Sequence, residues 1–239
     1  MSRQPVHLHV KPSDIANLVI AAGDPNRIQQ LAGLLKDAKL VNSNRGFITY
    51  TGYHEGKMIT LATHGIGGPS SAIVFEELYM LGAREIVRLG STGALTRELG
   101  TGDFIVPTGA AYDSGSLGVH VRNGTLPAVP SIDLTNRIVR SCEAEGVKYM
   151  TGPVFSTDAF YGEDAAFAER WAGRGVIGVE MECATLFALG LLRGFKAASL
   201  LIVSDSLVRK SQRKMAPAEK LAEQVEKAGR IVLNALTST

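Results

Sequence analysis

Short apolar stretches alternate with segments of helical periodicity along the chain. Apolar runs of strand length predict strands at residues 18–22, 47–53, 57–63, 85–89, 104–107, 150–155, 176–179 and 198–203. Apolar positions that recur at helical spacing predict helices at residues 28–35, 70–81, 133–145, 164–171, 181–192 and 217–236. This alternation predicts an α/β fold, a three-layer sandwich in which helices flank a mixed central β-sheet.

The turn after the first predicted strand has the features of an anion site. Gly23 is followed by Asp24, which suits the cap of the next helix, and by Pro25, which suits its first turn. The N–H groups at such a helix start are exposed and carry partial positive charge. Arg27 adds a permanent charge to the same turn, so the segment predicts anion binding.

Length and charge limit the domain organisation and the partners. The 239 residues contain no long Pro/Gly/Ser-rich linker, which predicts a single domain over residues 1–239. Lys and Arg number 25 against 23 Asp and Glu, so we expect neither a nucleic-acid partner nor an anionic membrane surface. The longest apolar stretches, such as residues 197–203, are too short to span a bilayer, and the N-terminus lacks the pattern of a secretory signal. We therefore expect a cytoplasmic protein.

Cysteine and histidine usage argues against a metal cofactor. Cys142 and Cys183 are the only cysteines, and they form neither a disulfide framework nor a metal-ligand spacing. The five histidines belong to no HExxH motif and no Cys/His cluster. We expect two reduced, buried thiols and no metal.

Groups that suit phosphate occur in three separate segments, namely residues 23–27, Arg45 and residues 88–93. Arginine offers a planar charged fork, glycine lets backbone N–H groups come close, and Ser91 adds a hydroxyl. A lone arginine after a strand is usually a solvated surface residue. Arg88 differs, because it lies inside an apolar strand where an unpaired charge is costly.

The second half of the chain supplies carboxylates at predicted strand exits. Glu180 and Glu182 flank Met181 between two apolar runs, and Asp205 follows the last apolar strand. Each acid also has a structural interpretation, since Glu182 suits the positive end of a helix and Asp205 suits the cap of a turn. Sites in α/β folds lie where strands end, which favours a functional role for these acids.

Four motifs occur in order, at residues 23–27 (Gly-Asp-Pro-Asn-Arg), 63–70 (Thr-His-Gly-Ile-Gly-Gly-Pro-Ser), 88–94 (Arg-Leu-Gly-Ser-Thr-Gly-Ala) and 180–182 (Glu-Met-Glu). In these motifs the chain resembles the nucleoside phosphorylase family, which includes hexameric purine nucleoside phosphorylases, uridine phosphorylases, 5′-methylthioadenosine phosphorylases and related nucleosidases. The resemblance extends from about His7 to the final helix. It implies inorganic phosphate as co-substrate, no other cofactor, and a homohexamer, a trimer of dimers whose sites are shared between adjacent subunits.

The resemblance also implies roles for individual residues. The phosphate-binding residues would be Gly23, Arg27, Arg88 and Ser91, with Arg45 reaching in from a neighbouring subunit. The ribose-binding residues would be Met181, Glu182 and His7, the last from the adjacent subunit, although His7 in a terminal segment also suits a structural role. The base-binding residues would be Phe160, Glu180, Ser204 and Asp205.

The expected reaction is phosphorolysis of a purine ribonucleoside. The C1′–N bond breaks through an oxocarbenium-like state, so phosphate held by arginines would attack C1′ while an acid protonates N7 of the leaving purine. Asp205 is the candidate acid, which predicts a raised pKa. Arg209 or Arg213 would assist it, and spacing does not choose between them.

Several alternatives stay open from the sequence. Uridine phosphorylases bind the base with a glutamine and an arginine after the aromatic segment, and residues 160–165 contain neither, which favours purines. A nucleosidase that uses water is disfavoured by the three arginines, and a dinucleotide-binding oxidoreductase by the absence of G-x-G-x-x-G spacing. A nucleoside-binding sensor would bind without turnover. The sequence does not separate inosine, guanosine, adenosine and 5′-methylthioadenosine.

Overall fold

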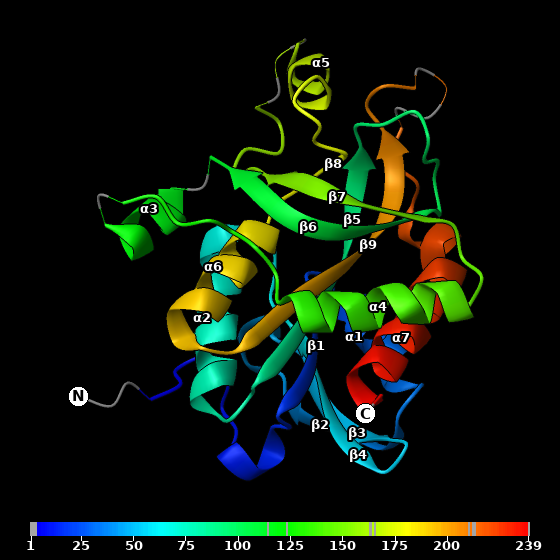
Figure 1. Ribbon diagram of the computed structural model, residues 1–239. Coiled ribbons are helices and arrows are strands. Elements are labelled where there is room, and N and C mark those ends of the chain that lie inside the picture. Colours follow the sequence, from blue (N-terminus) through cyan, green and yellow to red (C-terminus); the bar gives the residue numbers. More distant parts are fainter. Residues whose placement is uncertain are drawn as a thin grey trace.

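A mixed β-sheet forms the centre of the molecule (Figure 1). The computed structural model describes residues 4–113, 115–122, 124–162, 164, 166–209, 211 and 214–238. Within them nine strands follow the order β2-β3-β4-β1-β5-β8-β7-β6-β9. Their bounds are β1 Leu18–Ala22, β2 Lys36–Asn42, β3 Thr49–His54, β4 Lys57–Thr63, β5 Glu85–Ala94, β6 Phe104–Tyr112, β7 Tyr149–Ser156, β8 Gly178–Glu180 and β9 Lys196–Ser206.

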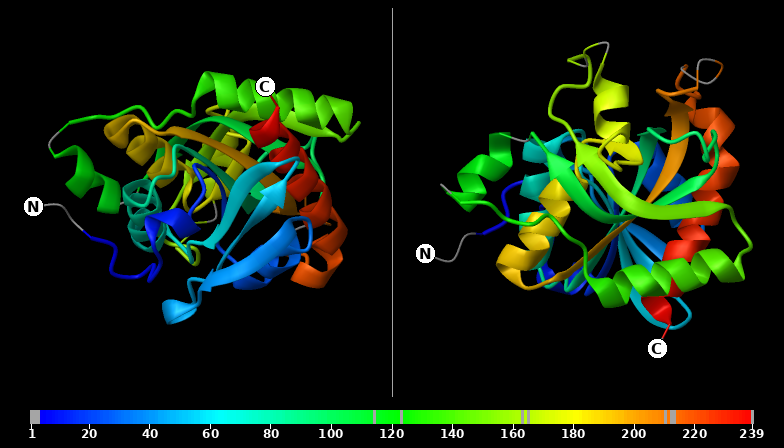
Figure 2. Two further views of the ribbon diagram at one scale, coloured as in Figure 1. Left: turned by 90° about the horizontal axis from the view of Figure 1, so that it is seen from below. Right: turned by 45° about the horizontal axis from the view of Figure 1, so that its top comes forward.

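One part of the sheet closes on itself. β9 pairs in parallel with β5 and antiparallel with β6, while β5 also pairs with β8, so β5, β8, β7, β6 and β9 form a ring. In Figures 1 and 2, β6 and β7 cross over the upper ends of β5 and β9. The second half of the chain is thereby brought against the end of β5.

Helices cover both faces of the sheet (Figure 2). α2 (Gly68–Met80) and α6 (Cys183–Arg193) pack on one face, where they meet alternate residues of β1 such as Val19. α1 (Pro25–Ala32), α4 (Ile132–Ala144) and α7 (Ala222–Thr237) pack on the other face, where they meet Ile20. Because successive side chains of a strand point to opposite faces, β1 is buried on both sides. The predicted arrangement of a mixed central sheet flanked by helices is confirmed.

Smaller elements complete the chain. Short α-helices lie at α3 (Gly115–Val121) and α5 (Phe167–Ala172), and 3-10 turns at Pro12–Asp14, Asn44–Gly46 and Ala218–Leu221. In the described part of the chain, the search for a helix long and apolar enough to cross a bilayer found none.

The prediction was wrong at several elements. β2 was missed because it is an edge strand of mostly exposed residues, whose sequence lacks the alternation of a half-buried strand. α3 was also missed. The strand predicted at residues 85–89 is longer, because β5 continues through residues 90–93 to Ala94, pairing with β9 and β8. The glycines at positions 90 and 93 leave space for neighbouring side chains and do not form a turn.

Candidate functional site

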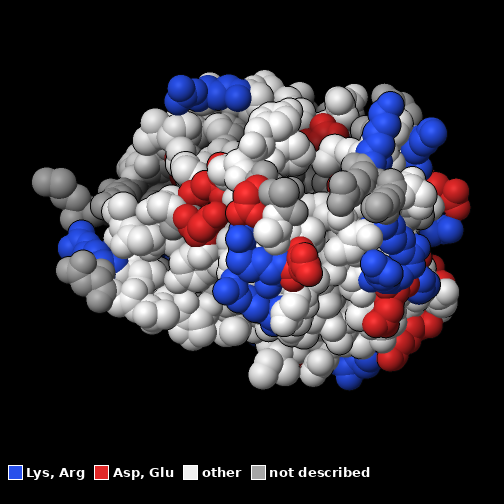
Figure 3. Space-filling model, turned by 90° about the horizontal axis from the view of Figure 1, so that it is seen from above, with Lys and Arg blue, Asp and Glu red and all other residues white. Residues whose placement is uncertain are grey.

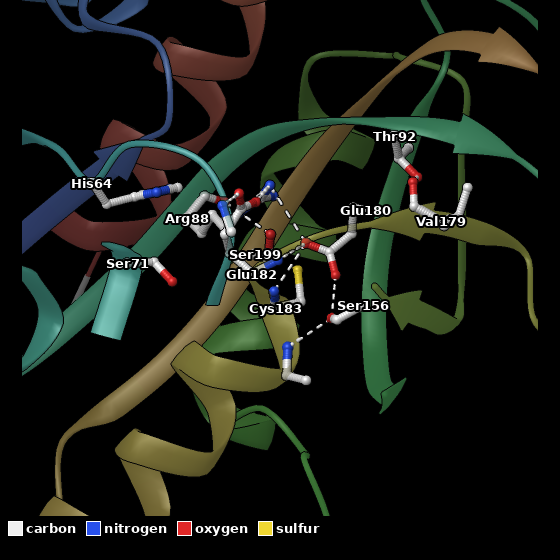
Figure 4. A network of polar contacts seen from close by, with 12 residues as sticks. His64, Ser71, Arg88, Thr92, Ser156, Val179, Glu180, Glu182, Cys183 and Ser199 are labelled. Carbon is white, nitrogen blue, oxygen red and sulfur yellow. Dashed lines mark hydrogen bonds and ion pairs between the residues drawn. The ribbon is translucent and has the colours of Figure 1, made fainter. Parts of the chain in front are cut away.

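Arg88 lies at the centre of a buried ionic network (Figure 4). It is only 4% exposed in the middle of β5. Its Nη2 is bonded to the Glu182 carboxylate and lies 3.4 Å from Oε2 of Glu180. The structure therefore joins three charged residues that the sequence places in separate motifs.

Backbone and hydroxyl groups fix both carboxylates. Gly67 N donates to Oε1 of Glu182 at 2.6 Å, which ties Glu182 to the start of α2. Glu180 Oε2 accepts from the backbone N–H groups of Glu182 at 2.8 Å and Cys183 at 2.9 Å, and its Oε1 accepts from Ser156 Oγ. Both oxygens of Glu180 are thus engaged within the protein, and it braces the turn that carries Glu182.

The charges of the network stabilise one another. Burial by itself raises the pKa of Glu182, but the positive charge of Arg88, the attraction of His64 and the hydrogen bonds from Gly67 and Arg88 together hold that pKa below its ordinary value. Burial likewise lowers the pKa of Arg88, yet Glu182 and Glu180 together raise it above the ordinary value. Both groups are therefore ionised at neutral pH.

A second arginine, Arg27, lies beside Arg88 and also has a hydrogen-bond donor without a partner. Arg27 lies in the first turn of α1, which Asp24 caps as predicted by accepting from Asn26 N at 2.9 Å. Its Nη1 donates to the Leu89 carbonyl on β5 at 3.1 Å. Burial, followed by repulsion from Arg88, lowers the pKa of Arg27 to about 10.

The open donors of the two arginines suit an anion. Among the described residues, Nε of Arg27 and both Nε and Nη1 of Arg88 have no hydrogen-bond partner although they are buried. Buried donors without partners are costly, and a bound oxyanion would satisfy them. On the face seen in Figure 3, positive and negative side chains are interspersed, so such an anion would depend on these local groups.

Gly90 makes room for the Arg88 side chain. A Cβ at position 90 would lie 1.8 Å from Nη1 and 2.5 Å from Cζ of Arg88, so any larger residue would displace the guanidinium. Gly23 allows a similar approach, because a Cβ there would lie 2.9 Å from the Gly65 carbonyl oxygen. These two glycines let the β5 strand, the α1 turn and the loop before α2 come together.

Asp205 lies on β9 opposite Gly93 of β5. Its Oδ2 is 3.4 Å from the position a Cβ of Gly93 would take, and its Oδ1 accepts from Ser204 Oγ at 2.7 Å. Burial raises the pKa of Asp205, against the opposing effect of Ser204. Gly90 and Gly93 are three positions apart in β5, so the strand positions that Arg88 and Asp205 approach are about 10 Å apart. That is about the length of a nucleoside.

The structure brings some of the other predicted residues next to the network and leaves others apart from it. Ser91 is half-buried within β5, the half-buried Met181 lies between the two glutamates, and Phe160 is 51% exposed with its ring 5.0 Å from that of Tyr161. No contact among the described residues joins Phe160 to the Arg88 network. Arg209 donates to the Arg97 carbonyl oxygen, and Arg213 lies outside the described residues.

The predicted subunit-bridging residues lie close to each other. His7 Nδ1 is 2.7 Å from Glu77 Oε1, and Asn44, next to the exposed Arg45, donates through Nδ2 to the His7 carbonyl oxygen at 2.9 Å. Glu77 also accepts from three backbone N–H groups of residues 6–8. Sequence reasoning missed Glu77, since nothing in the sequence indicates that it meets a segment about 70 positions earlier.

Two further residues of the site were missed by sequence reasoning. Ser156 Oγ also accepts from Ala184 N at 3.0 Å, which attaches β7 to the start of α6. His64 is fully buried beside the network. His64 belongs to the Thr-His-Gly-Ile-Gly-Gly-Pro-Ser motif. That motif was the signal available in the sequence, but it indicated no role for this residue.

In the described part of the chain, no group of three or more His, Cys, Asp or Glu is placed to hold a metal ion.

The comparisons with known proteins agree on one family. The profile of the phosphorylase superfamily matches residues 17–237. The chain is 36% identical to a guanosine phosphorylase of Halorubrum lacusprofundi, and the alignment covers 100% of each chain. It is 33% identical to a DeoD-type purine nucleoside phosphorylase of Yersinia enterocolitica over 86% of each chain. It is also 34% identical to a uridine phosphorylase of Thermococcus kodakarensis, covering 82% of this chain and 76% of the other. The chain therefore belongs to the phosphorylase superfamily.

Proposed function

We propose that this chain is a purine nucleoside phosphorylase, which transfers the ribosyl group of a purine ribonucleoside to inorganic phosphate. The observation that carries the proposal is the pair of buried arginines, Arg27 and Arg88, whose open donors lie beside Glu182, while Asp205 approaches the same strand, β5, at Gly93. The names of its relatives, guanosine phosphorylase and purine nucleoside phosphorylase, support the same reaction.

Phosphate binds between the two guanidinium groups. Arg27 and Arg88 donate to its oxygens, the backbone of Gly23 approaches closely, and Ser91 adds its hydroxyl and N–H. A phosphate oxygen attacks C1′ of the ribose as the C1′–N9 bond breaks, and the bonding electrons move into the purine ring. The arginines hold the nucleophile in place, which removes much of the entropic barrier.

Glu182 holds the ribose. Its carboxylate accepts hydrogen bonds from the sugar hydroxyls, and Met181 packs against the ring. The same carboxylate pairs with Arg88, which compensates its buried charge. Glu180, whose oxygens are engaged with Ser156 and backbone N–H groups, keeps Glu182 in position rather than touching the base.

Asp205 protonates the leaving purine. The burial that raises its pKa favours the neutral acid, which donates a proton to N7 as negative charge develops on the base. Ser204 orients the carboxyl group by its bond to Oδ1, and Phe160 packs beside the base. Arg209, or Arg213, stabilises the aspartate once its proton has left.

We further propose that the enzyme is a cytoplasmic homohexamer of purine salvage, a trimer of dimers. His7 and Arg45 lie together through Asn44, which suits their joint insertion into a neighbouring site. Arg45 would reach the phosphate and His7 the ribose 5′ end of that neighbour. Size-exclusion chromatography with light scattering tests the assembly, and a monomer with full activity contradicts the shared site.

A nucleoside panel assayed with phosphate tests the substrate class. We expect inosine, guanosine or adenosine to be cleaved, and uridine to be cleaved far more slowly. The Thermococcus uridine phosphorylase makes uridine the strongest competitor. Faster cleavage of uridine would replace the purine assignment, and binding of nucleosides without cleavage would indicate a sensor.

The Asp205→Asn variant tests the acid. Loss of a general acid lowers turnover by about 100- to 10,000-fold, so we expect that loss with inosine. 7-Methylguanosine already carries a positive charge on its base and needs no proton, so its cleavage should be largely preserved. Equal losses on the two substrates would refute the role of Asp205.

A further inference from the structure

His64 lies beside two of the predicted phosphate-binding segments, the turn at Gly23 and the strand at Arg88, and is itself fully buried (Figure 4). It follows β4, and its backbone N–H donates to the Ala22 carbonyl oxygen at 2.8 Å, which ties it to the end of β1. Its Cε1 is 3.5 Å from the position a Cβ of Gly23 would take. The imidazole therefore lies against the turn that leads to Arg27.

The hydrogen bonds of His64 define its tautomer. Nδ1 lies 2.8 Å from the Gly65 carbonyl oxygen, which only accepts, so Nδ1 carries the proton. Burial, outweighing the attraction of Glu182, lowers the pKa of His64 to about 4, and the ring is neutral at pH 7. Nε2 is then an acceptor, and no hydrogen-bond donor among the described residues reaches it.

The charged groups facing this ring are those of the site. Glu182, Arg88 and Arg27 all act on His64 electrostatically. On its other side lies Phe75 of α2, whose ring centroid is 5.3 Å away. An unpartnered lone pair is thus buried next to open guanidinium donors.

The main form of phosphate at neutral pH and above, HPO₄²⁻, needs such an acceptor. Three of its oxygens accept hydrogen bonds, while the fourth carries a proton that must be donated. Arg27, Arg88 and backbone N–H groups only donate. Glu182 can accept, but beside its bonds from Gly67 N and Arg88 the proposed function assigns its remaining lone pairs to the ribose hydroxyls.

We infer that His64 accepts the hydroxyl proton of bound HPO₄²⁻ through Nε2 and thereby makes the site selective for a protonated tetrahedral dianion. The contact also orients the anion, because it turns the P–OH towards the protein and leaves an unprotonated oxygen for C1′. Sulfate has the same shape and charge but carries no proton at this pH, so its oxygen would face the Nε2 lone pair. This inference rests on the proposed function, which supplies phosphate as the co-substrate.

Two substitutions test the acceptor role of His64 Nε2 separately from the hydrogen bond between Nδ1 and the Gly65 carbonyl oxygen. In His64→Asn the side-chain amide nitrogen takes the place of Nδ1, so the bond to the Gly65 carbonyl is kept and the acceptor is lost. In His64→Gln the longer side chain places an amide oxygen near the former Nε2. Binding of phosphate and of sulfate to wild type and both variants is measured by titration calorimetry, with thermal unfolding as the check of folding.

We expect the wild type to bind phosphate about tenfold or more tightly than sulfate. Sulfate cannot form the hydrogen bond to Nε2, and a hydrogen bond to a charged group contributes that much to binding. His64→Asn should bind phosphate about tenfold more weakly with sulfate binding nearly unchanged, and His64→Gln should regain part of the preference. Equal weakening for both anions in His64→Asn, or an unchanged preference, overturns the inference. Turnover is recorded separately: wild type that cleaves nucleosides without phosphate contradicts the proposed function, whereas phosphate-dependent wild type with an unselective site contradicts only the role of His64.

Discussion

Replacing Gly90 with alanine moves the guanidinium of Arg88. The new Cβ would lie 1.8 Å from Nη1, and the two atoms reach ordinary contact only at about 3.4 Å. The guanidinium must therefore shift by more than an ångström from the position in which it pairs with Glu182 and Glu180. Disturbance of a buried ion pair costs up to about 3–5 kcal/mol when one charge is left without its partner.

The same shift misplaces the group that would position phosphate. Displacement of a positioning group by about 1 Å can reduce the rate by about 100-fold. We expect kcat/KM for inosine or guanosine phosphorolysis to fall by about that factor in Gly90→Ala, with a raised KM for phosphate. Steady-state kinetics at varied phosphate measures the loss, and urea unfolding measures the stability.

Gly109→Ala is the matched control. Gly109 also lies in a strand, β6, but a Cβ there would be 3.6 Å from the Ala128 carbonyl oxygen, an ordinary contact. Both variants replace a strand glycine with alanine and change the entropy of the unfolded chain alike. The control should keep its activity, and a folded Gly90→Ala variant with wild-type kinetics would refute the placement of phosphate at Arg88.

Three further variants test other parts of the structure. Asp24→Ala removes the cap of α1 and should lower the free energy of unfolding by about 1 kcal/mol in urea titrations; no change would mean that the bond to Asn26 N contributes nothing. Asp205→Asn should raise the melting temperature at pH 7, because the folded-state pKa of Asp205 is raised and its ionised form opposes folding. That gain should shrink as the pH falls through the raised folded-state pKa, and it should be lost below the ordinary pKa of aspartic acid, where the wild-type carboxyl is neutral in both states. A gain independent of pH would contradict the cause. Glu77→Ala should speed hydrogen exchange at the amides of residues 6–8, which donate to Glu77, while exchange in β5 stays unchanged.

Local sequence patterns predicted much of the sheet and the helices. Residues 18–22 and 57–63 are strands with the predicted bounds, because both segments are mainly apolar and are followed directly by Gly23 and His64, where a turn begins. The cap at Asp24 was predicted because it depends only on residues within one turn. The edge strand β2 gave no such pattern, since its residues are mostly exposed and its polar and apolar positions do not alternate.

Local sequence patterns could not predict which of the site residues lie together in the structure. Arg88 was singled out because a charge inside an apolar strand needs a partner, but the partner lies 94 positions away. The contact of Asp205 with Gly93 depends on the register of β5 against β9, which includes an irregularity next to that pair. The role of Glu77 depends on how residues 6–8 cross α2, and no short-range signal in the sequence fixes that crossing.

Phosphate-dependent cleavage of a purine nucleoside is tested most directly by product stoichiometry. Purified protein is incubated with inosine, guanosine or adenosine in the presence and absence of inorganic phosphate, and free base and ribose 1-phosphate are quantified. We predict equal amounts of the two products when phosphate is present and no cleavage without it. Release of base with free ribose at the same rate in both conditions would contradict phosphorolysis.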